Sequence, residues 1–361
     1  METVNYQCPA CTAPLRYDEK TAKLQCDFCG SSYTVQEVED LYAMKSAQAA
    51  EAEIPDVPPA QQETEGDLHA YLCPSCGAEL ICEKTTAATA CPYCGNPTVV
   101  PGQLTGALKP DFVIPFKLEK NAAVEALHKH YGKWNFYLPK LFRRENHIQK
   151  VQGVYVPFWL YDAQVSGSGT YDCSDSVSHR EGDYQVTRTM HYVAERSGTA
   201  VFEKVPVDAS KKMPDNYMDS LEPFDYSQLK PFSPAYLPGF LADRYDETAE
   251  ACAPRMEKRC KNALSAKLSS DIDHTTVTQD SFHAAIDHSD AHYALLPVWM
   301  LTTQWKDKRY LFAMNGQTGK IVGELPTDPL LFFRNLGVLT LILTLLFRFS
   351  GLMKMILLLF R

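Results

Sequence analysis

The sequence predicts an α+β protein in which two small cysteine-bearing modules precede a mainly antiparallel, β-rich body with a few helices. A hydrophobic helix is expected to end the chain. Three observations predict this order: a duplicated pattern of paired cysteines, runs of β-branched and aromatic residues after residue 108, and an apolar C-terminal stretch. With 361 residues, of which 45% are hydrophobic and 22% charged, the chain can form a packed core.

An internal repeat relates two parts of the N-terminal third. Both copies read CxxC, fourteen residues, CxxC, and a shift of 65 residues superimposes them. Two CxxC turns that face each other across a hairpin offer zinc four tetrahedral thiolates and leave no open position for water. We therefore predict two structural zinc ribbons that hold two Zn²⁺ ions. The predicted ligands are Cys8, Cys11, Cys26 and Cys29 in the first ribbon, and Cys73, Cys76, Cys91 and Cys94 in the second.

Disulfides, or another thiophilic metal such as iron, are the alternatives for these cysteines. The chain starts METVNY, without a basic start or an apolar stretch, so we expect no secretory signal and a reducing, cytosolic surrounding. Paired CxxC motifs in that compartment favour metal over disulfides.

The formal charge of −9 lies entirely in the N-terminal third, because residues 1–110 carry 15 acidic and six basic side chains. Between the two copies, Ser46–Asp67 holds six acids, three prolines and no base, which predicts an extended linker. An acidic surface repels phosphate, so the charge disfavours nucleic-acid binding by the ribbons.

The body is expected to contain both strands and helices. Strand-like runs cover Val151–Val165, Tyr184–Val193, Thr199–Val207, Thr275–Ile286 and Ala294–Trp305, and Phe112–Phe116 predicts a strand near a sheet edge. Helices are expected at Val35–Ala50, at Asn121–His130 and at Asp246–Leu268, the last broken or started by Pro254. The Asn315–Gly319 segment, NGQTG, predicts a hairpin in which the Asn-Gly pair supplies the positive φ angles.

The last 33 residues contain no acid and four bases, namely Arg334, Arg348, Lys354 and Arg361. The apolar core of this segment, Leu336–Phe347, is only 12 residues long, whereas a spanning helix needs about 20. One arginine near a helix end can reach the membrane surface, so a single span is favoured over an interfacial or a buried helix. A tail anchor with the bulk of the chain in the cytoplasm follows. These considerations predict five segments: ribbon 1 at 1–45, a linker at 46–67, ribbon 2 at 68–107, the body at 108–328 and the membrane segment at 329–361.

Other residues that could carry chemistry show weaker patterns. Cys82, Cys173, Cys252 and Cys260 have no ligand spacing, and His283, His288 and His292 fall in a stretch that we interpret as a solvated strand-turn-strand. The hydrolase motif GxSxG, the metalloprotease motif HExxH and the phosphate loop are absent, which favours a protein that is not an enzyme. The Pro-aromatic segment Lys230–Phe240 predicts turn packing, with a peptide groove as the alternative.

Several motifs together resemble one bacterial family. They include CPAC and CDFC, CPSC and CPYCGNP, Val113–Lys120 (VIPFKLEK), Val151–Ala163, Val205–Met213, Glu222–Asp246 and the stretch from ALLPVWMLTTQW through Pro326. With these motifs the chain resembles the bacterial membrane proteins labelled TFIIB-type zinc-ribbon-containing proteins. The resemblance covers nearly the whole length and maps the eight cysteines onto that family's zinc ligands.

The resemblance implies a cytoplasmic zinc-ribbon protein with a C-terminal membrane segment. We predict no catalytic residues, because four thiolates leave zinc no open position and the enzyme motifs above are absent. It also implies protein partners, namely flotillin-like SPFH proteins and phage-shock-protein-A-like membrane-stress proteins. The expected function is thus a membrane-anchored adapter. A nucleic-acid-binding ribbon protein and a membrane enzyme that uses the histidine-rich stretch are the alternatives.

Overall fold

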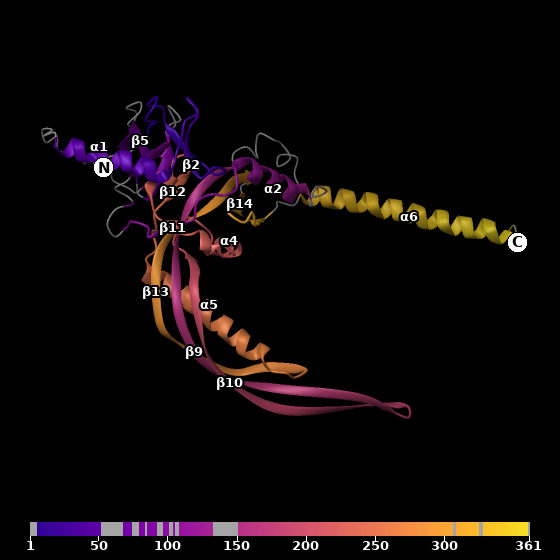
Figure 1. Cartoon of the computed structure of the whole chain (residues 1–361). Helices are drawn as coiled ribbons and strands as arrows, with labels where there is room; N and C mark the ends of the chain where they lie inside the picture. Colours follow the sequence, from indigo (N-terminus) through magenta and orange to yellow (C-terminus); the bar gives the residue numbers. More distant parts are fainter. Residues whose placement is uncertain are drawn as a thin grey trace.

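The fold is α+β and mainly antiparallel, with few helices and an apolar C-terminal helix, as the sequence predicts (Figure 1). The computed structural model describes residues 6–51, 68–73, 79–83, 85–91, 97–100, 104, 108–132, 151–305, 308–324 and 328–359. Figure 1 shows the N-terminal modules at one end of the body, a curved β-ribbon that leaves its other end, and the last helix projecting alone.

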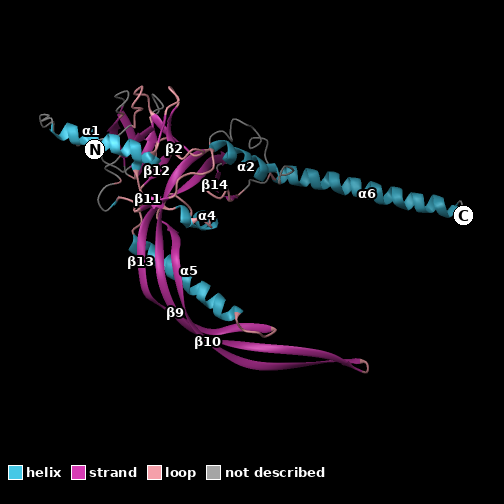
Figure 2. Cartoon of the chain, in the orientation of Figure 1, coloured by secondary structure: helices cyan, strands magenta, loops and turns pink. Residues whose placement is uncertain are grey.

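Three long strands form the centre of the body (Figure 2). The strand β9 (Gln152–Glu181) lies between β10 (Tyr184–Asp208) and β13 (Thr276–Trp305), and both neighbours run antiparallel to it. The five predicted strand runs of this region therefore join into three strands. Register shifts, at Phe202/Val205 in β10 and at Gln279/Ser281 and Ile286/His288 in β13, let these strands stay paired over such a length while they curve.

Shorter strands extend this sheet on both sides, in the order β11-β8-β13-β9-β12-β6-β7, while β14 pairs with β13 and β15. Two pairs, β12 with β9 and β8 with β13, are parallel, and the other strand pairs of the described residues are antiparallel. The bounds are β6 Thr86–Ala90, β7 Pro97–Val99, β8 Phe112–Val113, β11 Lys230–Pro231, β12 Leu241–Asp243, β14 Lys308–Asn315 and β15 Ile321–Gly323.

Two smaller sheets precede the body. A three-stranded sheet contains β1 (Leu15–Asp18), β2 (Lys23–Cys26) and β3 (Ser32–Tyr33), and a two-stranded sheet contains β4 (Leu68–Leu72) and β5 (Glu79–Glu83). The alternation along β1 and β2 buries Leu15, Tyr17, Leu24 and Cys26 on one face. The domain boundaries drawn from the sequence stay predictions.

Helix α5 (Ala249–Ser270) packs along the three long strands (Figure 2). Its buried side chains recur every four residues, which gives one apolar stripe: Cys252, Met256, Cys260, Leu264 and Leu268. The helix begins at Ala249 because the Thr248 hydroxyl caps it by accepting from the Ala251 amide at 3.4 Å. Pro254 neither starts nor breaks the helix, so that expectation was wrong; the proline lies inside its second turn.

The other predicted helices are also present. They are α1 (Val35–Glu51) and α2 (Lys120–Gly132), to which the structure adds α4 (Asp215–Ser220) and two short 3-10 turns at Tyr226–Gln228 and Pro234–Tyr236. The hydroxyl and amide of Thr34 both bond the Glu37 carboxylate, and the Glu37 amide returns a bond to the Thr34 hydroxyl. This capping box explains why α1 starts at Val35.

The predicted hairpin is formed by β14 and β15, but its turn differs from the expected Asn-Gly turn. The positive φ angle, +77°, belongs to Gly319. Asn315 is buried, and its side-chain oxygen accepts from the amides of Gln317 and Thr318 at 2.9 and 3.0 Å. Gly316 is needed for a different reason, since a Cβ there would lie 2.7 Å from the Phe116 ring.

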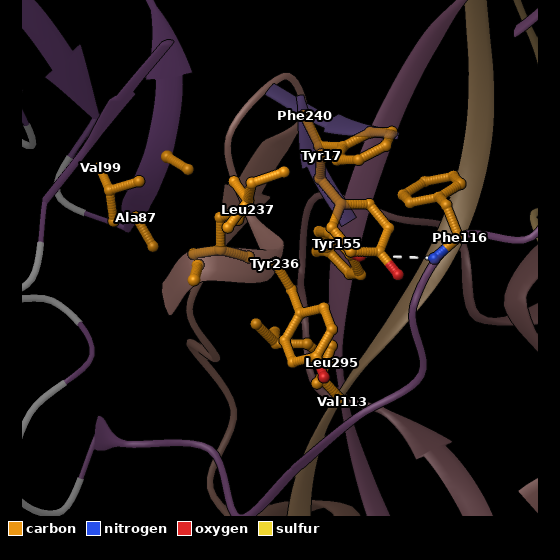
Figure 3. Close-up of a cluster of buried hydrophobic side chains, with 14 of the residues drawn as sticks. Tyr17, Ala87, Val99, Val113, Phe116, Tyr155, Tyr236, Leu237, Phe240 and Leu295 are labelled. Atoms are coloured by element: carbon orange, nitrogen blue, oxygen red, sulfur yellow. Dashed lines mark hydrogen bonds between the residues drawn. The ribbon is translucent and has the colours of Figure 1, made fainter. Parts of the chain in front are cut away.

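The main core joins the body to the first cysteine module (Figure 3). In the body, the rings of Phe116 and Phe240 stack at 4.2 Å, and Tyr155 packs edge-on against both. The Phe116 amide donates to the Tyr155 hydroxyl at 3.4 Å. Tyr17 of β1 reaches the same cluster through an edge contact with Tyr236 at 5.5 Å. The two parts therefore share one hydrophobic core.

Candidate metal centre

The first pair of cysteines lies in a tight turn that precedes β1. The Cys8 amide donates to the Ala13 carbonyl at 2.7 Å, and the Thr12 amide donates to the Cys8 carbonyl at 2.8 Å. Thr12 takes a positive φ of 61°, which a residue with a Cβ adopts at a cost of about 1 kcal/mol. Such a strained backbone persists where the surrounding structure requires it, as at a ligand site.

The second pair starts at Cys26, the last residue of β2, continues into the connection to β3, and repeats the same turn. The Cys26 amide donates to the Ser31 carbonyl at 2.9 Å, and the Gly30 amide donates to the Cys26 carbonyl at 2.9 Å. Here the positive φ, +75°, falls on Gly30, the residue that tolerates it best. The two turns thus carry the same hydrogen bonds and bring their sulfurs together across the small sheet.

The four sulfurs form a compact cluster. All four Sγ atoms lie within 4.8 Å of one another, and the contacts that cross between the turns are Cys8–Cys29 at 3.6 Å and Cys11–Cys26 at 3.5 Å. A tetrahedral zinc ion with sulfurs at about 2.3 Å would place neighbouring sulfurs about 3.8 Å apart. Disulfide sulfurs lie about 2.05 Å apart, so neither crossing contact is a disulfide. The donor set and its spacing fit a four-coordinate metal ion.

Four thiols at this spacing cannot all ionise without a cation between them. Hydrogen bonds from the Ser31 hydroxyl and amide, with neighbouring Cys11, lower the pKa of Cys29 to about 6. A hydrogen bond from the Ala13 amide lowers the pKa of Cys11, but desolvation and the three neighbouring thiols raise it by more. The net effect is a pKa of about 12 for Cys11. A cation bound between the four sulfurs would favour the thiolate form of each and so allow full ionisation.

Two polar side chains lie beside the cysteine cluster, and the sequence pattern did not identify them. The Ser31 hydroxyl lies 3.3 Å from the Cys29 sulfur, and the Tyr33 hydroxyl lies 3.9 Å from the Cys8 sulfur. Both belong to or adjoin β3, so the strand sets their direction. Such outer groups orient metal ligands, and the spacing of the cysteines alone does not reveal them.

The first module is fastened to the body at several points. The Tyr17 amide donates to the Pro238 carbonyl at 3.0 Å, and Lys20 pairs with Glu119 at 2.8 Å. Cys8 and Cys26 are themselves buried in the core that the module shares with the body. The cysteine cluster is therefore part of a rigid support and does not hang on a free loop.

The second set of cysteines is described in part. Cys73 and Cys91 are each 1% exposed and share a buried cluster with Tyr71 and Val100. They correspond in the repeat to Cys8 and Cys26, which are buried in the same way. Cys76 and Cys94 lie outside the described residues. In this half of the chain, β6 pairs with β7 and also with β12, so that hairpin belongs to the large sheet.

The remaining candidates do not form a comparable group. Within the described residues, the first four cysteines are the one cluster of three or more metal-ligating side chains. His283, His288 and His292 all lie on β13, which runs through the predicted turn as a continuous strand with a bulge, so the strand-turn-strand interpretation was wrong. His292 lies 3.9 Å from both Asp111 and Asp290, too far for hydrogen bonds. The other cysteines are buried or half-buried: Cys82, Cys173, Cys252 and Cys260.

The C-terminal helix α6 (Pro329–Leu359) forms a second candidate feature. Its first 21 residues, Pro329–Phe349, are long and apolar enough to cross a membrane, and none of this window is buried. Its exposed side chains include Phe347 at 82% exposure, Leu330 at 77% and Phe349 at 70%. Exposure of so many apolar side chains to water is unfavourable, so this helix is compatible with a membrane anchor.

Comparisons with known proteins place the chain beside one relative. No family model matches the sequence, and no solved structure matches it. The uncharacterized protein YdjG of Bacillus subtilis (strain 168) is 34% identical over 327 residues, which covers 90% of this chain and 90% of that protein. Since both chains align over nearly their whole lengths, they share one fold and one order of segments. The chain belongs to the family of Bacillus subtilis YdjG.

Proposed function

We propose that this protein is a membrane-anchored zinc-ribbon adapter of the TFIIB-type zinc-ribbon family. It would hold two structural zinc ions and organise protein partners at the cytoplasmic face of the membrane. The observation that carries the proposal is the cage of four sulfurs, built by two identical turns and joined to the core of a body that ends in an exposed apolar helix. The proposed partners are flotillin-like SPFH proteins and phage-shock-protein-A-like proteins.

A structural role for the metal follows from the number of ligands. Four thiolates fill a tetrahedral zinc ion, so no position is left for water or substrate. The residues that would hold the first ion are Cys8, Cys11, Cys26 and Cys29, and the ion would supply folding energy to a module too small to be stable alone. This arrangement supports a binding protein rather than an enzyme.

Protein partners suit the surface better than nucleic acid does. The N-terminal third carries the whole negative excess of the chain, and a zinc ion with four thiolates adds a further charge of about −2. Phosphate backbones would be repelled by such a surface. A basic protein segment would instead be attracted.

The anchor proposal rests on α6. Its 31 residues measure about 46 Å, more than the hydrocarbon core of about 30 Å. Arg334 and Arg348 are 14 residues apart, which places their Cα atoms about 21 Å apart along the axis. Each long side chain can extend outward to a membrane surface, so one span between the two arginines is feasible.

Metal analysis tests the ribbons. We expect two zinc ions per purified chain by elemental analysis, and one ion in each of the variants Cys26→Ser and Cys91→Ser. Cys260→Ser, which removes a buried cysteine from the α5 stripe, is the matched control and should keep two ions. A wild-type chain that holds one zinc ion or none would contradict the assignment of two ribbons.

Fractionation of cells tests the anchor. A chain that ends at residue 328 should move from the membrane to the soluble fraction, because it lacks the one helix among the described residues that is long and apolar enough to span. A variant with the acidic segment 46–67 deleted should stay with the membrane. Unchanged membrane association of the shortened chain would argue that another part of the protein binds the membrane, and it would refute the anchor.

A further inference from the structure

A gap one strand wide interrupts the large sheet next to the first cysteine module. The short strand β12 lies between β6 and β9, where Ala242 pairs with Ala88 and Leu241 pairs with Val154. Both neighbours continue beyond the last pair, β6 through Thr89–Ala90 and β9 through Gln152–Gly153. Within the described residues, no strand pairs with these two continuations on the side that faces the gap.

A cleft of about 440 Å³ occupies this position. The lining includes both strand continuations, the aromatic side chains of Phe240 and Trp299, and Asp18 and Glu19 of the first module. Gly153 packs directly against the Phe240 ring, because a Cβ there would lie 2.6 Å from that ring. The volume falls within the range of about 300–1,000 Å³ that ligand sites have.

We propose that this cleft binds an extended, basic peptide segment of a partner protein, which adds a strand between β6 and β9. Neighbouring strands of a sheet lie about 4.8 Å apart, so two edges that already hold β12 between them are spaced to hold one more strand in line with it. Unpaired strand edges offer backbone hydrogen bonds to an extended chain, as in other cases of strand addition.

The charge of the cleft selects a basic occupant. Its border carries Asp18, Glu19 and Asp27 against Arg16 and Lys120. Arg16 already pairs with Asp27 at 3.6 Å, which leaves two carboxylates against one lysine. The acidic excess of residues 1–110 acts in the same direction and would speed the approach of a positively charged segment.

The inference rests on the proposed adapter function, since it names how a partner would be held. It is nevertheless tested separately, with random linear peptides displayed on phage as the probe. The full-length chain, purified in detergent with zinc, is immobilised, and peptides are selected on it. We expect enrichment of peptides rich in Lys, Arg and β-branched residues, whose binding weakens as salt is raised. The absence of any enriched peptide would overturn the inference.

Backbone methylation distinguishes strand addition from other modes of binding. Each enriched peptide is synthesised with one N-methyl group at a time, and its affinity is measured by fluorescence anisotropy. In a strand that lies between two others, successive amides point alternately to the two neighbours, so every amide of the inserted segment has an edge to bond. Methylation at each residue inside the gap should therefore weaken binding about tenfold, whereas methylation of residues outside the gap should have little effect. A peptide that tolerates methylation at every position would refute strand addition.

Hydrogen exchange and a charge variant locate the site. A bound peptide should protect the amides of Gln152–Gly153 and Thr89–Ala90, and Glu19→Gln should weaken binding about two- to fivefold. Asp183→Asn, in the exposed turn between β9 and β10, removes a carboxylate far from the cleft and should leave binding unchanged. Protection at another strand edge, or equal effects of the two variants, would overturn the assignment. Zinc content and membrane fractionation judge the adapter proposal independently, so either can fail alone.

Discussion

Asp208 at the end of β10 gives the stability of the protein a distinctive dependence on pH. Its side chain is fully buried; the Oδ1 atom accepts from the Ser210 amide at 3.3 Å, and within the described residues the Oδ2 atom has no hydrogen-bond partner. Burial raises the pKa of this carboxyl group to about 8, although the Ser210 amide and nearby Arg255 act in the opposite direction. The folded protein therefore holds a proton that the unfolded chain releases at about pH 3.9.

The variant Asp208→Asn keeps the shape of the side chain and removes its titration. Between pH 4 and 8 the folded wild type binds one proton more than the unfolded chain does at this site, so its free energy of unfolding falls as the pH rises. The loss is about 1.4 kcal/mol per pH unit. From pH 5.5 to 7.5 the carboxyl group should therefore cost the wild type about 3 kcal/mol that the asparagine variant does not lose.

Urea unfolding of the full chain in detergent at these two pH values measures the difference. Tryptophan fluorescence is a suitable signal, because the Trp159 indole donates to the Glu247 carbonyl at 2.9 Å, beside the same end of α5. We expect Asp208→Asn to gain about 3 kcal/mol over the wild type between pH 5.5 and 7.5, with Asp183→Asn as the exposed control. An equal stability difference at both pH values would refute the argument that burial keeps Asp208 protonated.

Two further predictions concern glycines. Gly167→Ala should destabilise the protein by about 1–3 kcal/mol in urea unfolding, because its Cβ would lie 3.0 Å from Ala284, from the His283 carbonyl and from Leu264 of α5. The control Ser168→Ala, on the exposed side of the strand, should have little effect. Equal losses of stability in the two variants would contradict this account. Gly319→Ala should cost about 1 kcal/mol because of its φ of +77°, whereas an unchanged stability would show that the turn can change shape.

Features set by local spacing could be predicted from the sequence. The stripe of α5 and the hairpin of β14 and β15 follow from patterns within a few residues of each other. The first four cysteines lie together because each CxxC turn fixes two sulfurs and one short sheet joins the turns. The apolar C-terminal helix was likewise readable from composition.

Features set by contacts between distant residues could not be predicted. The polar stretches inside β9, β10 and β13 read as breaks between strands, but the ladders continue through them. There Gly167 of β9 and Gly198 of β10 lie close to leucine side chains of α5. The position of β6 beside β12 joins residues about 150 apart, and nothing in either segment signals it. The burial of Asp208 could not be predicted either, since α4, α5 and β10 together form its environment.

The shared core implies that metal loss from the first module should lower the local stability of the adjoining part of the body. Cys8 and Cys26 belong to the same buried cluster as Tyr155 and Phe240, and the Tyr17 amide bonds the loop that leads into β12. If the four sulfurs hold zinc, chelation leaves thiols that repel one another once ionised, and the module should loosen. Hydrogen exchange should then rise at Phe240 and Ala242, while amides near the tip of the β9–β10 ribbon, such as that of Thr187, keep their rates. If chelation raised the exchange rate at the tip but left the rate at Ala242 unchanged, the module and the body would be energetically independent despite their common core.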